Sequence, residues 1–173
     1  EPGGTPIGDQ IRQILMRLDN QELHPRTEIL LFLASRAQLV EQVIKPALRE
    51  GKLVLSDRFG DSTLAYQGYG HGIDLATLRA MLAFATDNLK PDLTLLLDVD
   101  VEIGLQRKRK EDEWNRLDAY ELAFHQRVRE GYHELCLQEP ERWRVIDAMQ
   151  PKEAVQIALR QAVMQFLQEK IND

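Results

Sequence analysis

Apolar residues recur at helical spacing along most of the chain. Positions three and four apart predict an amphipathic helix over residues 8–18, followed by a polar loop over 19–27. The longest such pattern covers residues 28–50. There we expect Pro46 to kink the helix, because proline has no amide proton to donate, and Gly51 to end it. Further helices are predicted over residues 75–87, 101–110, 119–138 and 151–169.

Short apolar segments between these helices read as strands. They are Leu53–Leu55, Thr94–Val99 and Trp143–Asp147. None alternates strictly between apolar and polar residues, which is typical of strands covered on both faces. Strands separated by helices predict an α/β fold in which helices flank a parallel sheet. No internal repeat or linker divides residues 1–173, so we expect a single domain.

Composition narrows the class of protein. The 173 residues are 43% hydrophobic and 29% charged, as in a globular domain, and the net charge of −6 gives no basic footprint for nucleic acid. The longest apolar run, Ile29–Ala34, is far shorter than the roughly 20 residues that cross a bilayer, so no membrane partner is expected. The single cysteine, Cys136, cannot form an internal disulfide, which favours a reducing cytoplasm.

Charged residues gather at the carboxyl ends of the predicted strands, where α/β sheets bind their ligands. Asp57 and Arg58 follow the first strand. A carboxylate there can orient a hydrated Mg²⁺, and a guanidinium can grip phosphate oxygens with two hydrogen bonds. The alternative is a local ion pair at a strand end. Asp98 and Asp100 follow the second strand, where Asp100 suits a helix N-cap equally well.

Two further groups of residues suit a nucleotide. Phe32 and Arg36 lie four apart and so share a helix face, where a ring can stack on a base and a guanidinium can donate to its carbonyl. Alternatively, Phe32 is core and Arg36 extends to solvent. Thr63, Tyr66 and Gln67 follow the Asp-Arg pair within ten residues, and their polar groups either read a base edge or belong to an ordinary exposed loop.

One dense basic run, Arg107-Lys108-Arg109-Lys110, opens a predicted flexible flap over about residues 107–118. A flap that closes on a polyphosphate would exclude water and stabilise the charge of a transferring phosphoryl group. The alternative is a solvated helix end whose cations complement the helix dipole, which the acidic residues 111–113 favour.

Several short motifs occur in a fixed order along almost the whole chain. They are Glu1-Pro2-Gly3-Gly4-Thr5, Leu31-Phe32-Leu33-Ala34-Ser35-Arg36, Asp57-Arg58-Phe59, Ala65-Tyr66-Gln67-Gly68, Asn115-Arg116-Leu117-Asp118 and Ile146-Asp147-Ala148-Met149-Gln150-Pro151. In this order and spacing they resemble the thymidylate kinase family, bacterial dTMP kinases among the P-loop nucleoside monophosphate kinases. The resemblance implies that fold, phosphoryl transfer from ATP to dTMP giving ADP and dTDP, a need for Mg²⁺, and a homodimer.

The resemblance also implies roles for the charged residues. Arg12 and Arg58 would hold the 5′-phosphate of dTMP. Asp57 would help to orient Mg²⁺ without binding it directly. Together with Arg58 and Asp57, the catalytic set would include Arg109 and Arg116 as flap arginines that stabilise the transferring phosphoryl group.

The other implied roles concern the bases and the sugar. Phe32 would stack on thymine, and Arg36 would hydrogen-bond its edge. Thr63 and Gln67 would contact the base, and Tyr66 would pack against the sugar. The remaining implied site residues are Glu1, near the sugar or the water shell of Mg²⁺, and Arg107, Ala148 and Gln150 on the ATP side.

The chain departs from the family in one large respect. The family opens with a strand and a phosphate-binding loop of the form Gly-x-x-x-x-Gly-Lys-Ser/Thr, and this motif is absent from the 173 residues. We therefore expect that roughly 35–40 N-terminal residues, with the central strand and this loop, are missing, and that residues 1–173 alone are inactive. Two alternatives stay open: a thymidine kinase, whose neutral substrate needs no pair of phosphate arginines, and a non-catalytic nucleotide-binding fragment.

Overall fold

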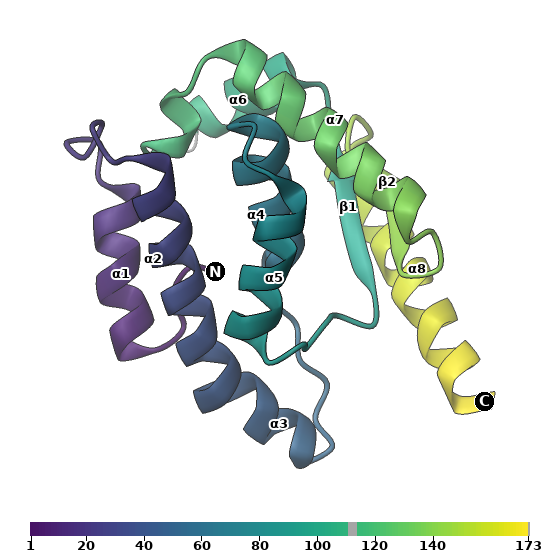
Figure 1. The fold of residues 1–173 in the computed structure, drawn as a ribbon. Coiled ribbons are helices and arrows are strands. Elements are labelled where there is room, and N and C mark those ends of the chain that lie inside the picture. The colour runs from purple at the N-terminus through teal and green to yellow at the C-terminus, as the bar shows by residue number, and fades with distance from the viewer. Residues whose placement is uncertain (111–113, 173) are drawn as a thin grey trace.

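Helices make up most of the fold, and capping residues set the ends of the first two (Figure 1). In the computed structural model, which describes residues 1–110 and 114–172, helix α1 spans Pro6–Met16 and Thr5 caps it by accepting a hydrogen bond from the amide of Gly8. Helix α2 spans Pro25–Leu39 and starts at a proline, whose missing amide proton costs nothing in a first turn. The predicted loop over 19–27 is therefore shorter than expected.

The helix predicted over residues 28–50 is present as a continuous helical stretch that consists of three successive segments. Helix α2 passes into a π-helical turn, η1 (Val40–Ile44), and then into α3 (Lys45–Arg49). Pro46 is the second residue after this turn, and a wider turn lets the helix pass a residue that cannot donate to its ladder. The kink predicted at Pro46 thus takes the form of a π turn. Gly51 follows the last turn with φ of 72°, a left-handed conformation that glycine adopts without strain.

The second half of the chain carries the sheet. Its elements are α4 (Gly60–Thr63), the π-helical turn η2 (Leu64–Gly70), α5 (Leu75–Thr86), β1 (Thr94–Asp98), α6 (Val101–Lys110), the 3-10 turn η3 (Leu117–Ala119), α7 (Leu122–Gln138), β2 (Trp143–Asp147) and α8 (Lys152–Asn172). Strands β1 and β2 pair in parallel, with Thr94 opposite Trp143 and Asp98 opposite Asp147. Helices α7 and α8 pack against β2 (Figure 1). The predicted α/β class with a parallel sheet is confirmed.

The strand predicted at Leu53–Leu55 is wrong. The segment forms no ladder with a described strand, and Leu53 and Leu55 expose 67% and 84% of their surface. A strand needs a neighbour at about 4.8 Å to pair its backbone groups. Instead, this segment and β1 line one cleft of 680 Å³, together with apolar side chains of α8 such as Phe166.

The main core lies between α2, η2, α5 and α7. Glycines allow η2 and α7 to approach closely: a Cβ on Gly70 would stand 2.6 Å from the ring of Phe124, and one on Gly131 would stand 2.5 Å from Tyr69. Thr63, Tyr66 and Gln67 therefore lie in a packed helical segment, which overturns the alternative that they belong to an ordinary exposed loop. Of the described helices, none is long and apolar enough to cross a membrane.

Candidate active site

Arg36 is buried and held on two sides. Only 2% of the residue is exposed; its Nε donates to Oε2 of Glu1 at 2.8 Å and its Nη1 donates to Oγ1 of Thr63 at 2.8 Å. The guanidinium also lies 5.5 Å from the ring centre of Phe59. This geometry excludes the reading in which Arg36 extends to solvent. It leaves Nη2 as the nitrogen without a hydrogen bond to another described residue, so this end of the fork can serve a ligand.

The loop before α1 brings Glu1 to this arginine. The amide of Gly3 donates to Oγ of Ser35, so the loop is fixed against α2 next to Arg36. Oε1 of Glu1 is buried and has no hydrogen-bond partner among the described residues, and a buried acceptor of this kind takes a water or a ligand hydroxyl. Arg12 lies exposed beside the same loop, where its Nη1 donates to the carbonyl of Pro2 at 3.0 Å.

Arg58 has an unusual backbone and no carboxylate partner within the described residues. Its φ is 67°, a left-handed conformation that costs free energy for any residue with a Cβ. Its guanidinium lies 3.4 Å from each of the phenol oxygens of Tyr66 and Tyr132, and 5.2 Å from the ring centre of Tyr66. Burial raises the pKa of Tyr132 to about 12, so this phenol stays neutral at physiological pH. The positive charge of Arg58 is thus available to an anion.

The aspartates at the strand ends differ in their surroundings. Asp98 accepts two 2.8 Å hydrogen bonds from Arg129, which lower the pKa of its carboxyl, and it lies 3.2 Å from Nε2 of His133. Asp57 is exposed beside the cleft, and its carboxylate makes no hydrogen bond within the described residues. Asp100 caps α6 by accepting from the amide of Glu102, so its reading as an N-cap is confirmed.

A magnesium ion that arrives with a nucleotide fits Asp57. The described residues contain no group of three His, Cys, Asp or Glu side chains that could hold a metal by themselves. Magnesium needs only one or two carboxylates when water and phosphate oxygens fill its other positions. The exposed side chain of Asp57, next to Arg58, offers one such carboxylate.

Gln67 is buried in a network that sequence reasoning missed. Its Nε2 donates to Oε1 of Glu28 at 2.7 Å, and Glu28 itself is fully buried on α2. The signal was present in the spacing, because Glu28, Phe32 and Arg36 lie four apart and so share one face of α2. Phe32 is half-buried on that face. The clue was therefore Glu28, a charged residue on the face of α2 that also carries the candidate ligand groups of Phe32 and Arg36.

Arg116 belongs to the same network and not to an exposed flap. Only 3% of the residue is exposed; Nε donates to the carbonyl of Leu15 at 2.9 Å, Nη1 to the phenol of Tyr120 at 2.7 Å, and Nη2 to Glu28. Each guanidinium nitrogen thus has a protein acceptor. In this arrangement Arg116 joins the turn η3 to α1 and α2, which is not the role expected of a flap arginine.

The residues predicted for the ATP side meet at the ends of β1 and β2. Nη1 of Arg107 donates to the carbonyl of Ala148 at 2.7 Å, and Gln150 donates to Asp147 at 2.9 Å. Arg109 is exposed, with its guanidinium 4.8 Å from the ring centre of Trp114. Residues 111–113 of the predicted flap lie outside the described residues.

Comparison with known proteins agrees with the motifs. The profile of the family described as thymidylate kinase matches residues 1–159. The thymidylate kinase of Roseiflexus castenholzii is 55% identical over 168 residues, which cover 90% of this chain and 73% of the relative. That of Thermomicrobium roseum is 51% identical over 168 residues (96% and 79%), and that of Desulfovibrio desulfuricans is 47% identical over 177 residues (98% and 82%). The chain therefore belongs to the thymidylate kinase family.

Proposed function

We propose that this protein transfers the γ-phosphoryl group of ATP to a 5′-phosphate oxygen of dTMP, giving ADP and dTDP. The bond between the γ-phosphorus and its bridging oxygen breaks, and a bond from that phosphorus to dTMP forms. Family membership supports the reaction. The observation that carries it here is the buried Arg36, fixed by Glu1 and Thr63 with one nitrogen left for a ligand.

The acceptor nucleotide would lie between α2 and the segment of residues 57–67. Arg58 and Arg12 would hold its phosphate, because neither guanidinium has a carboxylate partner among the described residues. Arg36 and Thr63 would contact the base, and Phe32 on the same face of α2 would stack on it. Phosphoryl transfer needs positioning and charge stabilisation more than covalent chemistry, so a site of fixed arginines suits it.

The donor nucleotide would lie on the other side of Asp57. Arg107, Ala148 and Gln150 would border adenine, and Arg109 would approach the phosphates from the end of α6. Magnesium bound with ATP would neutralise phosphate charge, and Asp57 would orient its water shell. The 680 Å³ cleft next to Asp57 would give this side of the site its space.

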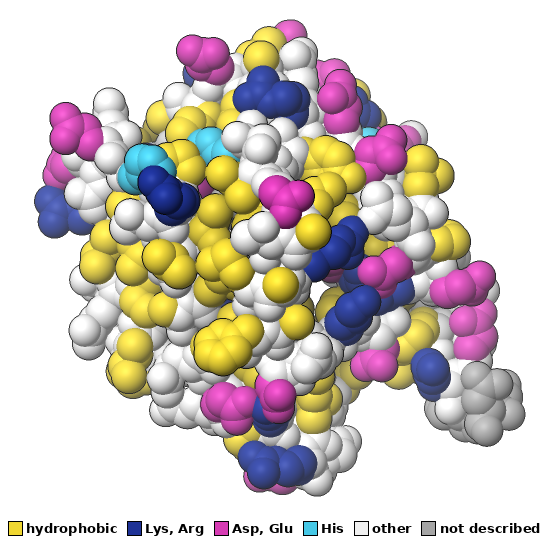
Figure 2. Space-filling view, in the orientation of Figure 1, with side chains coloured by type: hydrophobic (Ala, Val, Ile, Leu, Met, Phe, Trp, Pro, Cys, Tyr) yellow, Lys and Arg dark blue, Asp and Glu magenta, His cyan; other side chains and the backbone are white. Residues whose placement is uncertain are grey.

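We also propose a cytoplasmic homodimer. Hydrophobic side chains gather over the face of α1, α2 and α5 (Figure 2), and among the exposed ones are Ile7, Leu30 and Phe84. An apolar face of this kind marks a protein contact surface. Light scattering coupled to size exclusion tests it: the unsubstituted protein is expected at twice the chain mass, and Phe84→Asp is expected to shift it toward the monomer.

An assay of ADP release tests the reaction. With the complete protein, dTMP is expected to trigger ADP release and thymidine is not, because thymidine lacks the phosphate that Arg58 would hold. Turnover of thymidine in preference to dTMP would establish a thymidine kinase. Binding of dTMP without ADP release would establish a non-catalytic nucleotide-binding protein.

A further inference from the structure

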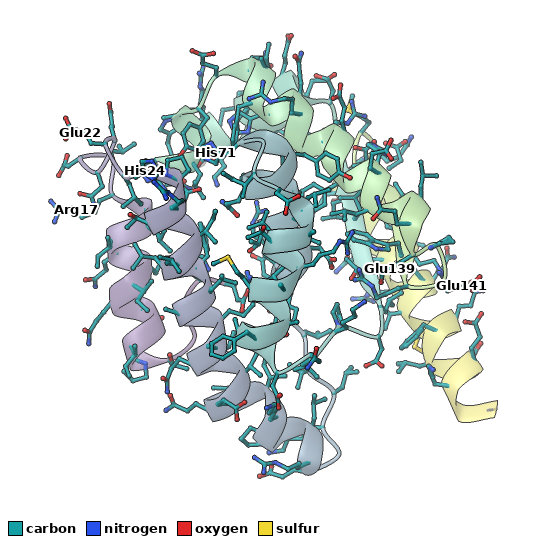
Figure 3. The ribbon with its side chains drawn as sticks, in the orientation of Figure 1. Arg17, Glu22, His24, His71, Glu139 and Glu141 are labelled. Atoms are coloured by element: carbon teal, nitrogen blue, oxygen red, sulfur yellow. The ribbon has the colours of Figure 1, made fainter. Side chains whose placement is uncertain are left out.

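A largely buried network joins Glu28 of α2 to Gln67 of η2 and to three side chains that lie just outside the helical turns, His71, Arg116 and Tyr120. Oε1 of Glu28 accepts from Gln67 at 2.7 Å and lies 3.4 Å from Nε2 of His71. Oε2 accepts from the phenol of Tyr120 at 3.0 Å and from Arg116. His71 is labelled in Figure 3, and its contact with Glu28 places it beside the N-terminal end of α2. Both oxygens of a fully buried carboxylate are thus satisfied by donors.

Glu28 is ionised at any pH at which the protein would work. Burial alone would raise the pKa of this carboxyl, but the nearby imidazole of His71 and the hydrogen bonds from Arg116 and Gln67 outweigh it and lower the pKa to about 2. An ionised carboxylate has lone pairs and no proton, so it can only accept hydrogen bonds. Every neighbour of Glu28 must therefore turn a donor toward it.

This requirement fixes the amide of Gln67. With Nε2 committed to Glu28, the carbonyl Oε1 accepts no hydrogen bond from a described residue and is the end of the amide left for a ligand. The opposite orientation would bring two oxygens together at 2.7 Å in a buried place, where unmatched polar groups cost the most. Gln67 is itself 2% exposed, so water cannot relieve such a clash.

The neighbouring arginine has the opposite hydrogen-bonding character. Glu28 and Arg36 lie two turns apart on α2, and their partners Gln67 and Thr63 lie four residues apart on the facing helical segment. Between them the two pairs present a donor from Arg36 and an acceptor from Gln67. The edge of thymine or uracil offers an oxygen at position 4 and an N–H at position 3, which matches this pair. Cytosine offers an amino group and a bare nitrogen, which is the reverse pattern.

We propose that Glu28 is a positioning residue that sets the hydrogen-bond polarity of the base site, holding Gln67 so that the site takes pyrimidines with a 4-oxo group and a protonated N3 and rejects cytosine. Glu28 acts through Gln67 and does not itself touch the nucleotide. Arg116 and Tyr120 hold Glu28 in turn, which connects base selection to the turn η3 that follows α6. The inference rests on the proposed function, because it assigns the base of dTMP to this place.

Calorimetric titration of dTMP and dCMP into Glu28→Gln tests the proposal. A glutamine at position 28 can donate as well as accept, so Gln67 becomes able to turn its NH₂ toward the ligand. In the unsubstituted protein dCMP is expected to bind at least about 1,000-fold more weakly than dTMP, since a mismatched base leaves buried polar groups unpaired. In Glu28→Gln we expect this ratio to fall at least about tenfold. Equal weakening of both nucleotides, with the ratio unchanged, would overturn the proposal.

Tyr120→Phe is the matched control, because it removes one hydrogen bond from Glu28 and leaves the bond to Gln67 intact. In Tyr120→Phe the ratio of dCMP to dTMP affinity is expected to stay within about twofold of its value in the unsubstituted protein, even where both nucleotides bind more weakly or the protein is less stable. A change in the ratio as large as that of Glu28→Gln would show that any damage to the network relaxes selection, which also contradicts a role through the Gln67 amide.

Nuclear magnetic resonance of the unsubstituted protein without ligand provides a second readout, which does not require Glu28→Gln or Tyr120→Phe to fold. The side-chain NH₂ of Gln67, assigned by its loss in Gln67→Leu, is expected to exchange slowly with water because it is buried and bound to Glu28. Fast exchange would overturn the proposal. Failure of the unsubstituted protein to bind dTMP would count against the proposed function, and the exchange measurement distinguishes the two.

Discussion

Asp61 and Arg142 form a two-pronged ion pair, with Nη1 and Nη2 of the arginine each 2.8 Å from one carboxylate oxygen of the aspartate. Nη1 also donates to Oγ1 of Thr94, the first residue of β1. The pair therefore fixes α4, which begins two residues after Arg58, to the amino ends of both strands. Parallel hydrogen bonds of this kind hold geometry as well as charge.

Asp61→Ala is expected to lower the free energy of unfolding by about 2 kcal/mol, because it leaves a largely buried guanidinium with fewer partners. Urea denaturation measures this loss. Asp19→Ala removes the carboxylate of an exposed pair with Arg17 and is expected to change stability by less than about 0.5 kcal/mol. Equal effects of the two variants would contradict the structural role of Asp61.

Arg58→Ala is expected to lower kcat/KM for dTMP by several orders of magnitude in the complete protein, because a charged clamp on a phosphoryl group contributes several kcal/mol at the transition state. Its Tm is expected to change little, since Arg58 is an exposed residue whose guanidinium, among the described residues, hydrogen-bonds only to two phenols, each at 3.4 Å. Steady-state kinetics and thermal melting check both statements. A loss of activity of less than about threefold would show that Arg58 does not bind the phosphate.

Stability is expected to fall in acid through Glu28. Its pKa of about 2 lies below the ordinary value of 4.5, so the folded state favours the ionised form. The stabilisation is complete above pH 4.5 and is lost as the pH falls from there toward 2, with a total on the order of 3 kcal/mol. Urea denaturation at several pH values should show a weaker acid dependence in Glu28→Gln than in the unsubstituted protein. Identical slopes would mean that Glu28 does not contribute.

Gly70→Ala is expected to lower stability by about 1–3 kcal/mol, because the added methyl group would stand 2.6 Å from the ring of Phe124. To relieve this contact η2 would have to move away from α7. Because Gln67 lies on η2, this movement is expected to weaken dTMP binding. Gly72→Asn is the control: its φ of 73° suits asparagine, and nothing lies within 4 Å of an added Cβ. Thermal melts of both variants, with dTMP titrations, check the difference.

The sequence predicted those parts of the fold that depend on local pattern. Strands β1 and β2 and helices α5 and α6 lie within a few residues of their expected ends, because hydrophobic spacing and capping residues are short-range signals. The segment Leu53–Leu55 shows the limit, since an apolar pattern cannot say whether a pairing neighbour is present.

The same limit applies to the candidate site. Arg36, Thr63 and Glu1 were expected there because motifs named them, and the structure brings them together. Glu28 and Arg116 could not be paired in advance, because they are 88 positions apart and no local rule relates them. Gln67 was predicted to contact a base, but which end of its amide faces the ligand depends on that distant pair.

The open edge of β1 has a consequence for handling the protein. Within the described residues β1 pairs on one side alone, with β2, and an open strand edge of this kind offers unpaired backbone groups to strands of neighbouring molecules. Residues 1–173 in isolation are therefore expected to aggregate as their concentration rises, with light scattering increasing faster than linearly. A soluble peptide of alternating valine and threonine that seats in the cleft should delay this, whereas a scrambled, proline-containing peptide should not.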